Sequence, residues 1–204
     1  MPARLYALRH APSQTPAGVR IGQTDVPLKY CDDSIFLACL QTLPRGAALI
    51  TSPLRRARAS ADRLIAAGLA PRSRREEAAL SEQHFGAWEA QAYDDLAARY
   101  GRTYWAFWDD PVHHRPPGGE SFADLAERSR NALIKMDFST TADTIVVSHA
   151  GVLRAWLALA CDRPLAQALS WPVAHMTPFV FTPGPGGRLT LDAAHGCRPP
   201  TALP

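Results

Sequence analysis

Apolar residues recur every three to four positions in three stretches of the chain, a spacing that places them on one face of an α-helix. These stretches cover residues 35–43, 54–68 and 122–136. Ser121 and Asp124 stand at the start of the third stretch with the spacing of a capping box, in which each side chain bonds the other's backbone N–H. The pattern therefore predicts three amphipathic helices.

Three short apolar runs are too brief for helices and are typical of strands. They span residues 5–8, 47–50 and 144–147, and the last is rich in β-branched side chains. Residues 151–160 are apolar nearly all round, as in a helix packed deep against a sheet. Strands alternating with helices indicate crossover connections. We predict an α/β fold with three α/β/α layers and a mainly parallel central sheet.

The pattern changes toward the C-terminus. Two strand-like runs, 172–182 and 188–193, flank a turn rich in proline and glycine, and the Pro-rich tail 198–204 is expected to be flexible. A chain of 204 residues is long enough to bury about 70% of its unfolded surface without a disulfide or a metal. Since no repeat or linker divides it, we expect a single domain over residues 1–204.

Composition and charge exclude several classes of protein. No apolar run approaches the ~20 residues that cross a bilayer, and the N-terminal residues lead into a strand without a signal-peptide core, so we expect a soluble, cytoplasmic protein. The net charge of +3 comes without long basic blocks, which argues against a nucleic-acid partner. Four well-separated cysteines are expected to be reduced thiols: Cys31, Cys39, Cys161 and Cys197.

Histidines and arginines follow three of the predicted strands. Arg9 and His10 end the first, Arg55 and Arg56 follow the second, and His149 follows the third. In open α/β sheets ligands gather at the carboxyl ends of the strands, where the next helices also present their N-terminal N–H groups. Each of these residues alone has an ordinary structural explanation, but together they favour a phosphate site. Helical periodicity does not choose between Arg55 and Arg56.

Four motifs, taken in sequence order, point to a known family. They are Leu-Arg-His at 8–10, Ser-Pro-Leu-Arg-Arg-Ala at 52–57, Leu-Ser-Glu-Gln-His-Phe-Gly-Ala-Trp-Glu at 80–89 and Ser-His-Ala-Gly-Val at 148–152. Together they resemble the phosphoglycerate mutase-like branch of the histidine phosphatase superfamily over residues 4–160. The resemblance implies a phosphoglycerate mutase-like fold and phosphoryl transfer that needs neither a metal nor another cofactor.

The resemblance also implies roles for the strand-end residues. His10 is the expected nucleophile, which forms a phosphohistidine, while Arg9, Arg56 and His149 hold the phosphoryl oxygens. The family's phosphate-binding arginine precedes an alanine, which selects Arg56 over Arg55. These roles agree with chemistry, because guanidinium donors match phosphate oxygens and a neutral imidazole is nucleophilic near pH 7.

Glu82 matches the family's general acid, which protonates the leaving alkoxide and then activates water. Its alternative explanation is an ordinary surface carboxylate. Glu89 and Glu120 are rivals for the acid role, although Glu120 precedes a helix, where a negative charge already stabilises the helix dipole. We expect Glu82 to be the acid.

The loop after the nucleophile departs from the family pattern. Ala11 and Ala90 stand where the family usually has glycine, and the loop lacks the family's asparagine. Arg20 is the candidate to replace that asparagine. Ser13 and Gln23 complete the residues expected to contact the phosphate.

Residues 22–28 and 116–121 are similar to the α-ribazole phosphatase group, which acts in assembly of the cobalamin lower ligand. The resemblance implies a small phosphate ester, α-ribazole 5′-phosphate, as substrate. Five residues ahead of the second segment are candidates for a wall against a flat base, or else for ordinary core or lid packing: Trp105, Phe107, Trp108, His113 and His114.

Several alternatives remain open. Asp109, Asp110, His113 and His114 suggest a metal site, but no second carboxylate cluster supports one, so we expect no metal. A phosphoglycerate mutase is a competitor, although residues 89–121 are short for the insertions that cover mutase sites. A broad sugar-phosphate phosphatase and a catalytically idle phosphate-binding module are the others. We expect a small-molecule substrate, no membrane partner, and a monomer or homodimer.

Overall fold

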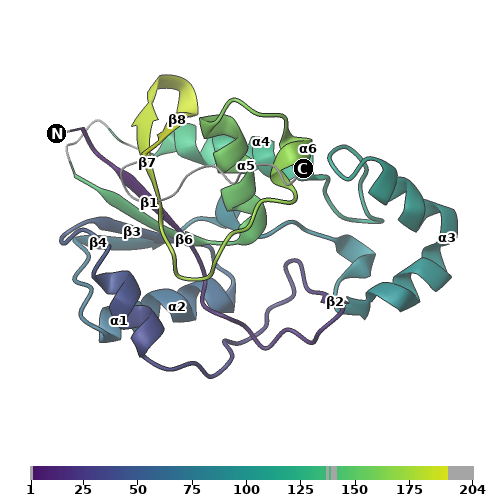
Figure 1. Cartoon of the computed structure of the whole chain (residues 1–204), viewed down its shortest axis with the longest axis horizontal. Coiled ribbons are helices and arrows are strands. Elements are labelled where there is room, and N and C mark those ends of the chain that lie inside the picture. Colours follow the sequence, from purple (N-terminus) through teal and green to yellow (C-terminus); the bar gives the residue numbers. More distant parts are fainter. Residues whose placement is uncertain (1, 137, 139–141, 193–204) are drawn as a thin grey trace.

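A six-stranded sheet forms the centre of the molecule in the computed structural model, which describes residues 2–136, 138 and 142–192. Its strand order is β4-β3-β6-β1-β7-β8 (Figure 1). The first four of these are parallel to one another, whereas β7 and β8 are each antiparallel to their neighbour. The strands are β1 Leu5–Arg9, β3 Ala48–Thr51, β4 Ser73–Glu76, β6 Thr144–Ser148, β7 Phe179–Gly184 and β8 Arg188–Leu191.

The register of the three central strands brings their carboxyl ends level. Arg9 of β1 is paired with Ser148 of β6, and Thr51 of β3 is paired with Val147 of β6. The backbone N–H of His10 continues the ladder by donating to the Ser148 carbonyl at 2.9 Å. The segments that follow β1, β3 and β6 therefore start at one edge of the sheet, as predicted.

Helices cover both faces of this sheet (Figure 1). Alternate side chains of β1 enter different cores: Leu5 and Ala7 join a cluster with α4 and α5, and Tyr6 and Leu8 join a cluster with α1 and α2. The predicted capping box of Ser121 is present at the start of α4. These helices are α1 Ser34–Leu40, α2 Arg55–Ala66, α4 Phe122–Lys135, α5 Ala150–Ala160 and the short α6 Leu165–Ala168. The predicted α/β fold is confirmed.

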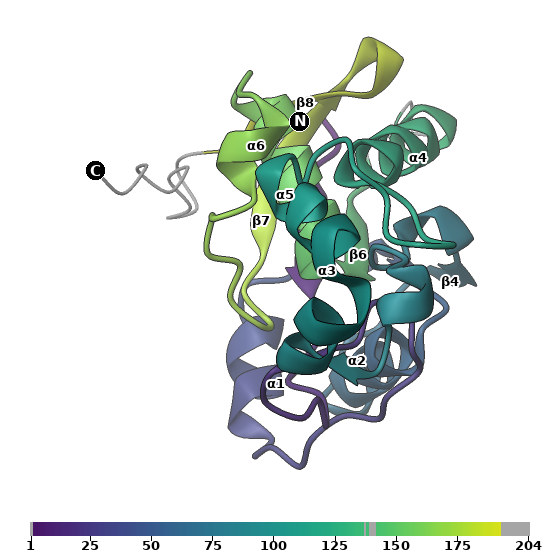
Figure 2. The same cartoon turned by 90° about the vertical axis from the view of Figure 1, so that its right-hand side faces the viewer.

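One helix lies away from the sheet. The chain forms α3, Tyr93–Asp109, which packs around Trp88 at one end of the molecule and stands in the foreground of Figure 2. The sequence analysis did not predict this helix. Its apolar residues pack in a small cluster around Trp88 and not against the central sheet. Beside it lies a two-stranded sheet of β2 Val19–Arg20 and β5 Gln91–Ala92. The remaining short elements are the 3-10 helices η1 Ala78–Leu80, η2 Gly86–Trp88 and η3 Pro185–Gly187.

The C-terminal prediction needs a correction. The run predicted as a strand over 172–182 is extended in the sheet only from Phe179. The residues before it form a loop along the carboxyl end of β1, where Met176 N–H donates to the Arg9 carbonyl at 2.9 Å. The predicted tail, 198–204, and Cys197 lie outside the described residues. None of the helices in the described part of the chain has the length and apolar character to span a bilayer.

Candidate active site

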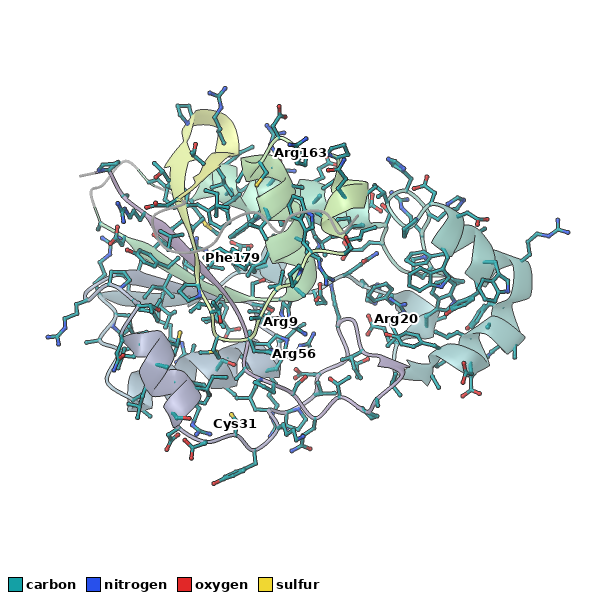
Figure 3. All side chains as sticks on the ribbon, viewed as in Figure 1. Arg9, Arg20, Cys31, Arg56, Arg163 and Phe179 are labelled. Carbon is teal, nitrogen blue, oxygen red and sulfur yellow. The ribbon has the colours of Figure 1, made fainter. Side chains whose placement is uncertain are left out.

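A cavity of about 300 Å³ opens at the carboxyl ends of β1, β3 and β6. The arginines predicted from two of these strand ends both line this cavity, and Figure 3 labels Arg9 above Arg56. Six of the residues expected to contact substrate line the cavity: Arg9, His10, Ser13, Arg20, Arg56 and Glu82.

His10 is held with one ring nitrogen free. Its Nδ1 lies 2.6 Å from the carbonyl oxygen of Ala11, which can only accept a hydrogen bond, so Nδ1 carries the proton and donates. The lone pair is therefore on Nε2. Burial lowers the pKa of His10 to about 3, which keeps the imidazole neutral at pH 7. The ring has the tautomer and charge state of a nucleophile.

His149 packs beside this ring, as the first residue before α5. Its Nε2 is hydrogen-bonded to Ser52 Oγ at 2.8 Å, so that the ends of β6 and β3 are joined. Burial lowers the pKa of His149 well below its usual value. Its Nδ1 is buried and has no hydrogen-bond partner within the described part of the chain. Leaving a buried nitrogen without a hydrogen bond is unfavourable, so a ligand or a water that bonds to it stabilises the site.

Arg56 is fixed by the loop that follows β2. Its two terminal nitrogens donate to the carbonyls of Thr24 at 2.9 Å and Gly22 at 2.6 Å. Gly22 has a φ of +53°, and a Cβ there would lie 2.4 Å from Glu89 Oε1, so the position requires glycine. Arg56 is 3% exposed and lines the cavity, whereas Arg55 faces solvent and does not line it.

Arg9 approaches the cavity from the end of β1. Its Nη1 donates to the Val173 carbonyl at 2.9 Å, and its Nε is buried without a partner among the residues described. Burial lowers the pKa of Arg9, and the nearby Glu82 carboxylate opposes that shift. A guanidinium fixed on one side, with unused donors on the other, suits an anion.

Glu82 sits at the N-terminus of α5. Its Oε1 accepts from the N–H groups of Gln83 at 2.9 Å and Gly151 at 3.1 Å. A Cβ at position 151 would lie 2.2 Å from that oxygen, so only glycine lets the carboxylate approach the helix end. Among the carboxylates that the structure describes, Glu82 alone lines the cavity.

The two rival carboxylates have structural partners. Glu89 accepts from the N–H groups of Gln23 and Phe85 and from the Thr24 hydroxyl, and so joins the loop after β2 to the segment before η2. Glu120 forms an ion pair with Arg128 at 2.6 Å. Neither lines the cavity.

Ser13, Gln23 and Arg20, the other residues expected to contact the phosphate, do not all reach the cavity. Ser13 lines the cavity and shares a hydrogen bond with Thr15. Gln23 does not line it, and its side-chain amide instead donates to the backbone carbonyl of Glu82 at 2.9 Å. Arg20 lines the cavity on the side where α3 lies.

Two residues of the site were missed by the sequence analysis. Arg154 lines the cavity one turn after Gly151 on α5, a spacing that could have revealed it. The ring of His175 lies 5.4 Å from the ring of His10, and its Nδ1 donates to the His10 carbonyl at 2.5 Å. No signal marked His175, because its segment was predicted as a strand.

The site combines positive charge with neutral histidines. Arg9, Arg20, Arg56 and Arg154 face Glu82 as the single carboxylate of the lining. Across the described residues, no group of three or more His, Cys, Asp or Glu side chains is arranged to hold a metal ion, and His113 of the suggested cluster is hydrogen-bonded to Asp110 at 2.9 Å. The arrangement fits a dianion held by the guanidinium groups of Arg9 and Arg56 beside an available imidazole nitrogen.

The family model for the histidine phosphatase superfamily (branch 1) matches residues 5–191. An adenosylcobalamin/alpha-ribazole phosphatase from Salmonella typhimurium is 31% identical over 170 residues, which cover 80% of this chain and 82% of that protein. A 6-phosphofructo-2-kinase/fructose-2,6-bisphosphatase from Caenorhabditis elegans is 37% identical over 89 residues. That match covers 44% of this chain and 19% of the longer protein.

Among solved structures, the alpha-ribazole phosphatase from Shigella flexneri superposes with a TM-score of 0.79 at 22% identity, over 93% of this chain and 94% of that one. At this identity the likeness shows a shared fold. The family match, in contrast, spans nearly all of the described residues and contains the whole cavity. The chain belongs to the histidine phosphatase superfamily, and it is a phosphatase of that family.

Proposed function

We propose that this phosphatase hydrolyses α-ribazole 5′-phosphate through a phosphohistidine formed on His10. The observation that carries the chemistry is the state of the His10 ring. Its Nδ1 proton is committed to the Ala11 carbonyl, and its pKa is lowered to about 3, so Nε2 offers a lone pair across the working pH range. Nucleophilic catalysis needs that lone pair next to the phosphorus.

In the first step, Nε2 of His10 attacks phosphorus and the ester P–O bond breaks. The departing alkoxide takes a proton from the Glu82 carboxyl group, which stands at the cavity wall. In the second step, Glu82 removes a proton from water, the hydroxide attacks phosphorus, and the N–P bond breaks to release phosphate and neutral imidazole. Glu82 thus gives one proton and regains one in each cycle.

The phosphoryl oxygens are held by Arg9, Arg56 and His149. Both arginines have backbone carbonyls that fix their position, and His149 has an unused buried Nδ1. Phosphoryl transfer depends on positioning and on stabilising the charge of the three equatorial oxygens. Arg9 and Arg56 line the cavity and already make their backbone hydrogen bonds, so the cost of reorganising them is small.

The choice of α-ribazole 5′-phosphate rests on a second cavity of about 360 Å³ beside the first. Phe107 and Trp108 line it, in support of an aromatic wall for a flat base. Trp105 is 59% exposed and, like His113 and His114, does not line it. The similarity to an adenosylcobalamin/alpha-ribazole phosphatase over four fifths of the chain favours the same substrate.

Steady-state kinetics on three esters test this proposal. We expect kcat/KM for α-ribazole 5′-phosphate to exceed the values for ribose 5-phosphate and 3-phosphoglycerate by at least about tenfold, with inorganic phosphate as the product. The variant His10→Asn is the control for contaminating phosphatases. Equal kcat/KM values on all three esters would show a phosphatase of broad range and would overturn the proposed substrate.

A further inference from the structure

Arg20 is held among aromatic rings rather than by hydrogen bonds. Its guanidinium carbon lies 4.3 Å from the centre of the Phe85 ring, 5.0 Å from Tyr93 and 5.3 Å from Trp108. These residues come from the segment before η2 and from both ends of α3. Contact between a guanidinium and ring faces is attractive and becomes stronger away from water. The rings therefore both position Arg20 and offset its charge.

The guanidinium of Arg20 has an unused hydrogen-bond donor among the described residues. Its Nε is buried without a hydrogen-bond partner. Figure 3 places Arg20 on the α3 side of the site, away from Arg9 and Arg56. Because Arg20 lines both the phosphate cavity and the second cavity, its donors stand where the two cavities join.

Arg154 borders the same junction from α5. Its Nε donates to the Trp171 carbonyl at 3.0 Å, which fixes the side chain and leaves the two terminal nitrogens for a ligand. It also lines both cavities. Its positive charge interacts with the Glu82 carboxylate. The charge of Arg20 is thus stabilised by aromatic rings and that of Arg154 by Glu82, while both guanidinium groups keep N–H donors that a ligand can use.

Among the residues that the structure describes, no carboxylate lines the second cavity, which is mainly apolar. Besides the two arginines it is lined by Phe85, Phe107 and Trp108 together with Gln83, Pro111, Leu169 and Ser170. Rings and guanidinium planes favour a flat group packed against them, and donors at the entrance favour oxygen or nitrogen acceptors. A second anion is less well matched, because the charges of both arginines are already offset.

We propose that Arg20 and Arg154 are specificity-determining residues that bind the alcohol half of the substrate, a sugar bearing a flat heteroaromatic ring. The sugar oxygens accept hydrogen bonds from the two arginines, and the ring packs against Trp108 and Phe107 at the wall of the second cavity. This inference rests on the proposed function, because it assigns the part of the ester that leaves. It gives Arg20 a role toward the leaving group in place of the phosphate contact expected from the sequence.

The variants Arg20→Met and Arg154→Met test the subsite, with α-ribazole 5′-phosphate and ribose 5-phosphate as substrates. Methionine keeps an unbranched, apolar side chain and removes the donors. Loss of a hydrogen bond from a charged donor costs about 10- to 100-fold in kcat/KM. For each variant we expect that loss on α-ribazole 5′-phosphate and a loss below about threefold on p-nitrophenyl phosphate, which has no sugar. Ribose 5-phosphate should show an intermediate loss.

The matched control is Arg102→Met, because Arg102 is an exposed arginine of α3. This variant should have wild-type kinetics on all three substrates. Equal losses on all substrates in Arg20→Met and Arg154→Met would overturn the subsite, since they would indicate a structural or phosphate-binding role. A wild-type preference for 3-phosphoglycerate that disappears in both variants would also overturn it and identify a second-anion site.

The failure of this inference is distinct from the failure of the proposed function. If wild-type enzyme prefers α-ribazole 5′-phosphate and both variants keep the preference, only the subsite is wrong. If wild-type enzyme shows no preference, the proposed substrate is wrong as well. Phosphorylation of His10 by p-nitrophenyl phosphate reports on the chemistry in either case.

Discussion

The imidazole rings of His10 and His149 lie 5.1 Å apart between their centroids, with their planes tilted by 59°. These residues are far apart in the chain and follow two neighbouring parallel strands, β1 and β6. The ring of His10 has its Nδ1 committed to the Ala11 carbonyl, and the ring of His149 has a buried Nδ1 without a partner in the described chain. The site needs both functions beside one phosphoryl group.

Glu82→Gln should separate substrates by their leaving group. An alkoxide needs a proton, whereas p-nitrophenolate departs without one. We therefore expect kcat/KM, which reports the steps up to release of the leaving group, to fall about 10²- to 10⁴-fold on α-ribazole 5′-phosphate and less than about tenfold on p-nitrophenyl phosphate. Pre-steady-state release of p-nitrophenol measures the first step alone. Glu120→Gln, which weakens a structural ion pair, should affect both esters equally. Equal losses in Glu82→Gln would argue against the acid role.

Arg56→Lys should reduce kcat/KM on every phosphate ester by about 10²-fold or more. Lysine has one point charge and cannot bind the Thr24 and Gly22 carbonyls while reaching a phosphate. The neighbouring Arg55→Lys is the control, because Arg55 faces solvent on the same helix turn. Vanadate inhibition measures the same loss of oxyanion binding. An Arg56→Lys enzyme with near wild-type kinetics would show that the phosphate binds elsewhere.

Ala90→Gly should stabilise the protein. Ala90 has a φ of +58°, a left-handed conformation that costs an L-residue about 1–2 kcal/mol and glycine almost nothing. The extra entropy of glycine in the unfolded chain offsets part of this gain, so we expect the free energy of unfolding to rise by about 0.5 kcal/mol. Urea denaturation measures it. Ala126→Gly, within α4, is the control and should lower stability by about 1 kcal/mol. A loss in Ala90→Gly as large as in this control would contradict the argument.

Three histidines make stability dependent on pH: His10 and His149 are buried, and His175 is half-buried. Burial lowers the pKa of His10 to about 3 and also lowers those of His149 and His175, whereas an unfolded histidine has a pKa of 6.5. Below pH 6.5 the unfolded chain therefore binds more protons than the folded one. We expect the contribution of these groups to the unfolding free energy to be fully present above pH 6.5. Below it, the contribution of His10 falls by up to about 1.4 kcal/mol per pH unit down to about pH 3, and His149 and His175 act in the same direction.

Urea unfolding between pH 7.5 and 4.5 measures this slope in the wild-type enzyme and in His10→Asn. The variant lacks one of the three groups, so its stability should depend less steeply on pH. A slope that is the same in both proteins would show that His10 is not held neutral by the fold.

Much of the site followed from the chain pattern, because strand ends and motifs are local features. Because Arg9 of β1 pairs with Ser148 of β6, the motifs that contain Arg9 and His149 lie side by side in the fold. The choice of Arg56 over Arg55 needed the family resemblance, and the fold then buried one and exposed the other. Glu82 was separable from its rivals only once their partners were known.

Other features depend on long-range packing that no local pattern reports. β4 consists of exposed polar residues and is a strand only because β3 is beside it. His175 reaches His10 through an irregular loop, and α3 packs on Trp88 rather than on the sheet. The contact of Arg20 with the ring of Trp108 in α3 joins residues more than 80 positions apart in the chain. Whether the protein is a monomer or a homodimer stays a prediction.

The most direct test of the central claim is to trap the phosphoenzyme. The enzyme is mixed with p-nitrophenyl phosphate, quenched in alkali, in which phosphohistidine survives, and digested for mass spectrometry. We predict one phosphoryl group on His10, a burst of p-nitrophenol equal to the enzyme concentration, and neither signal in His10→Asn. A phosphoryl group on another residue, or His10→Asn turnover above about a tenth of the wild-type rate, would contradict the account.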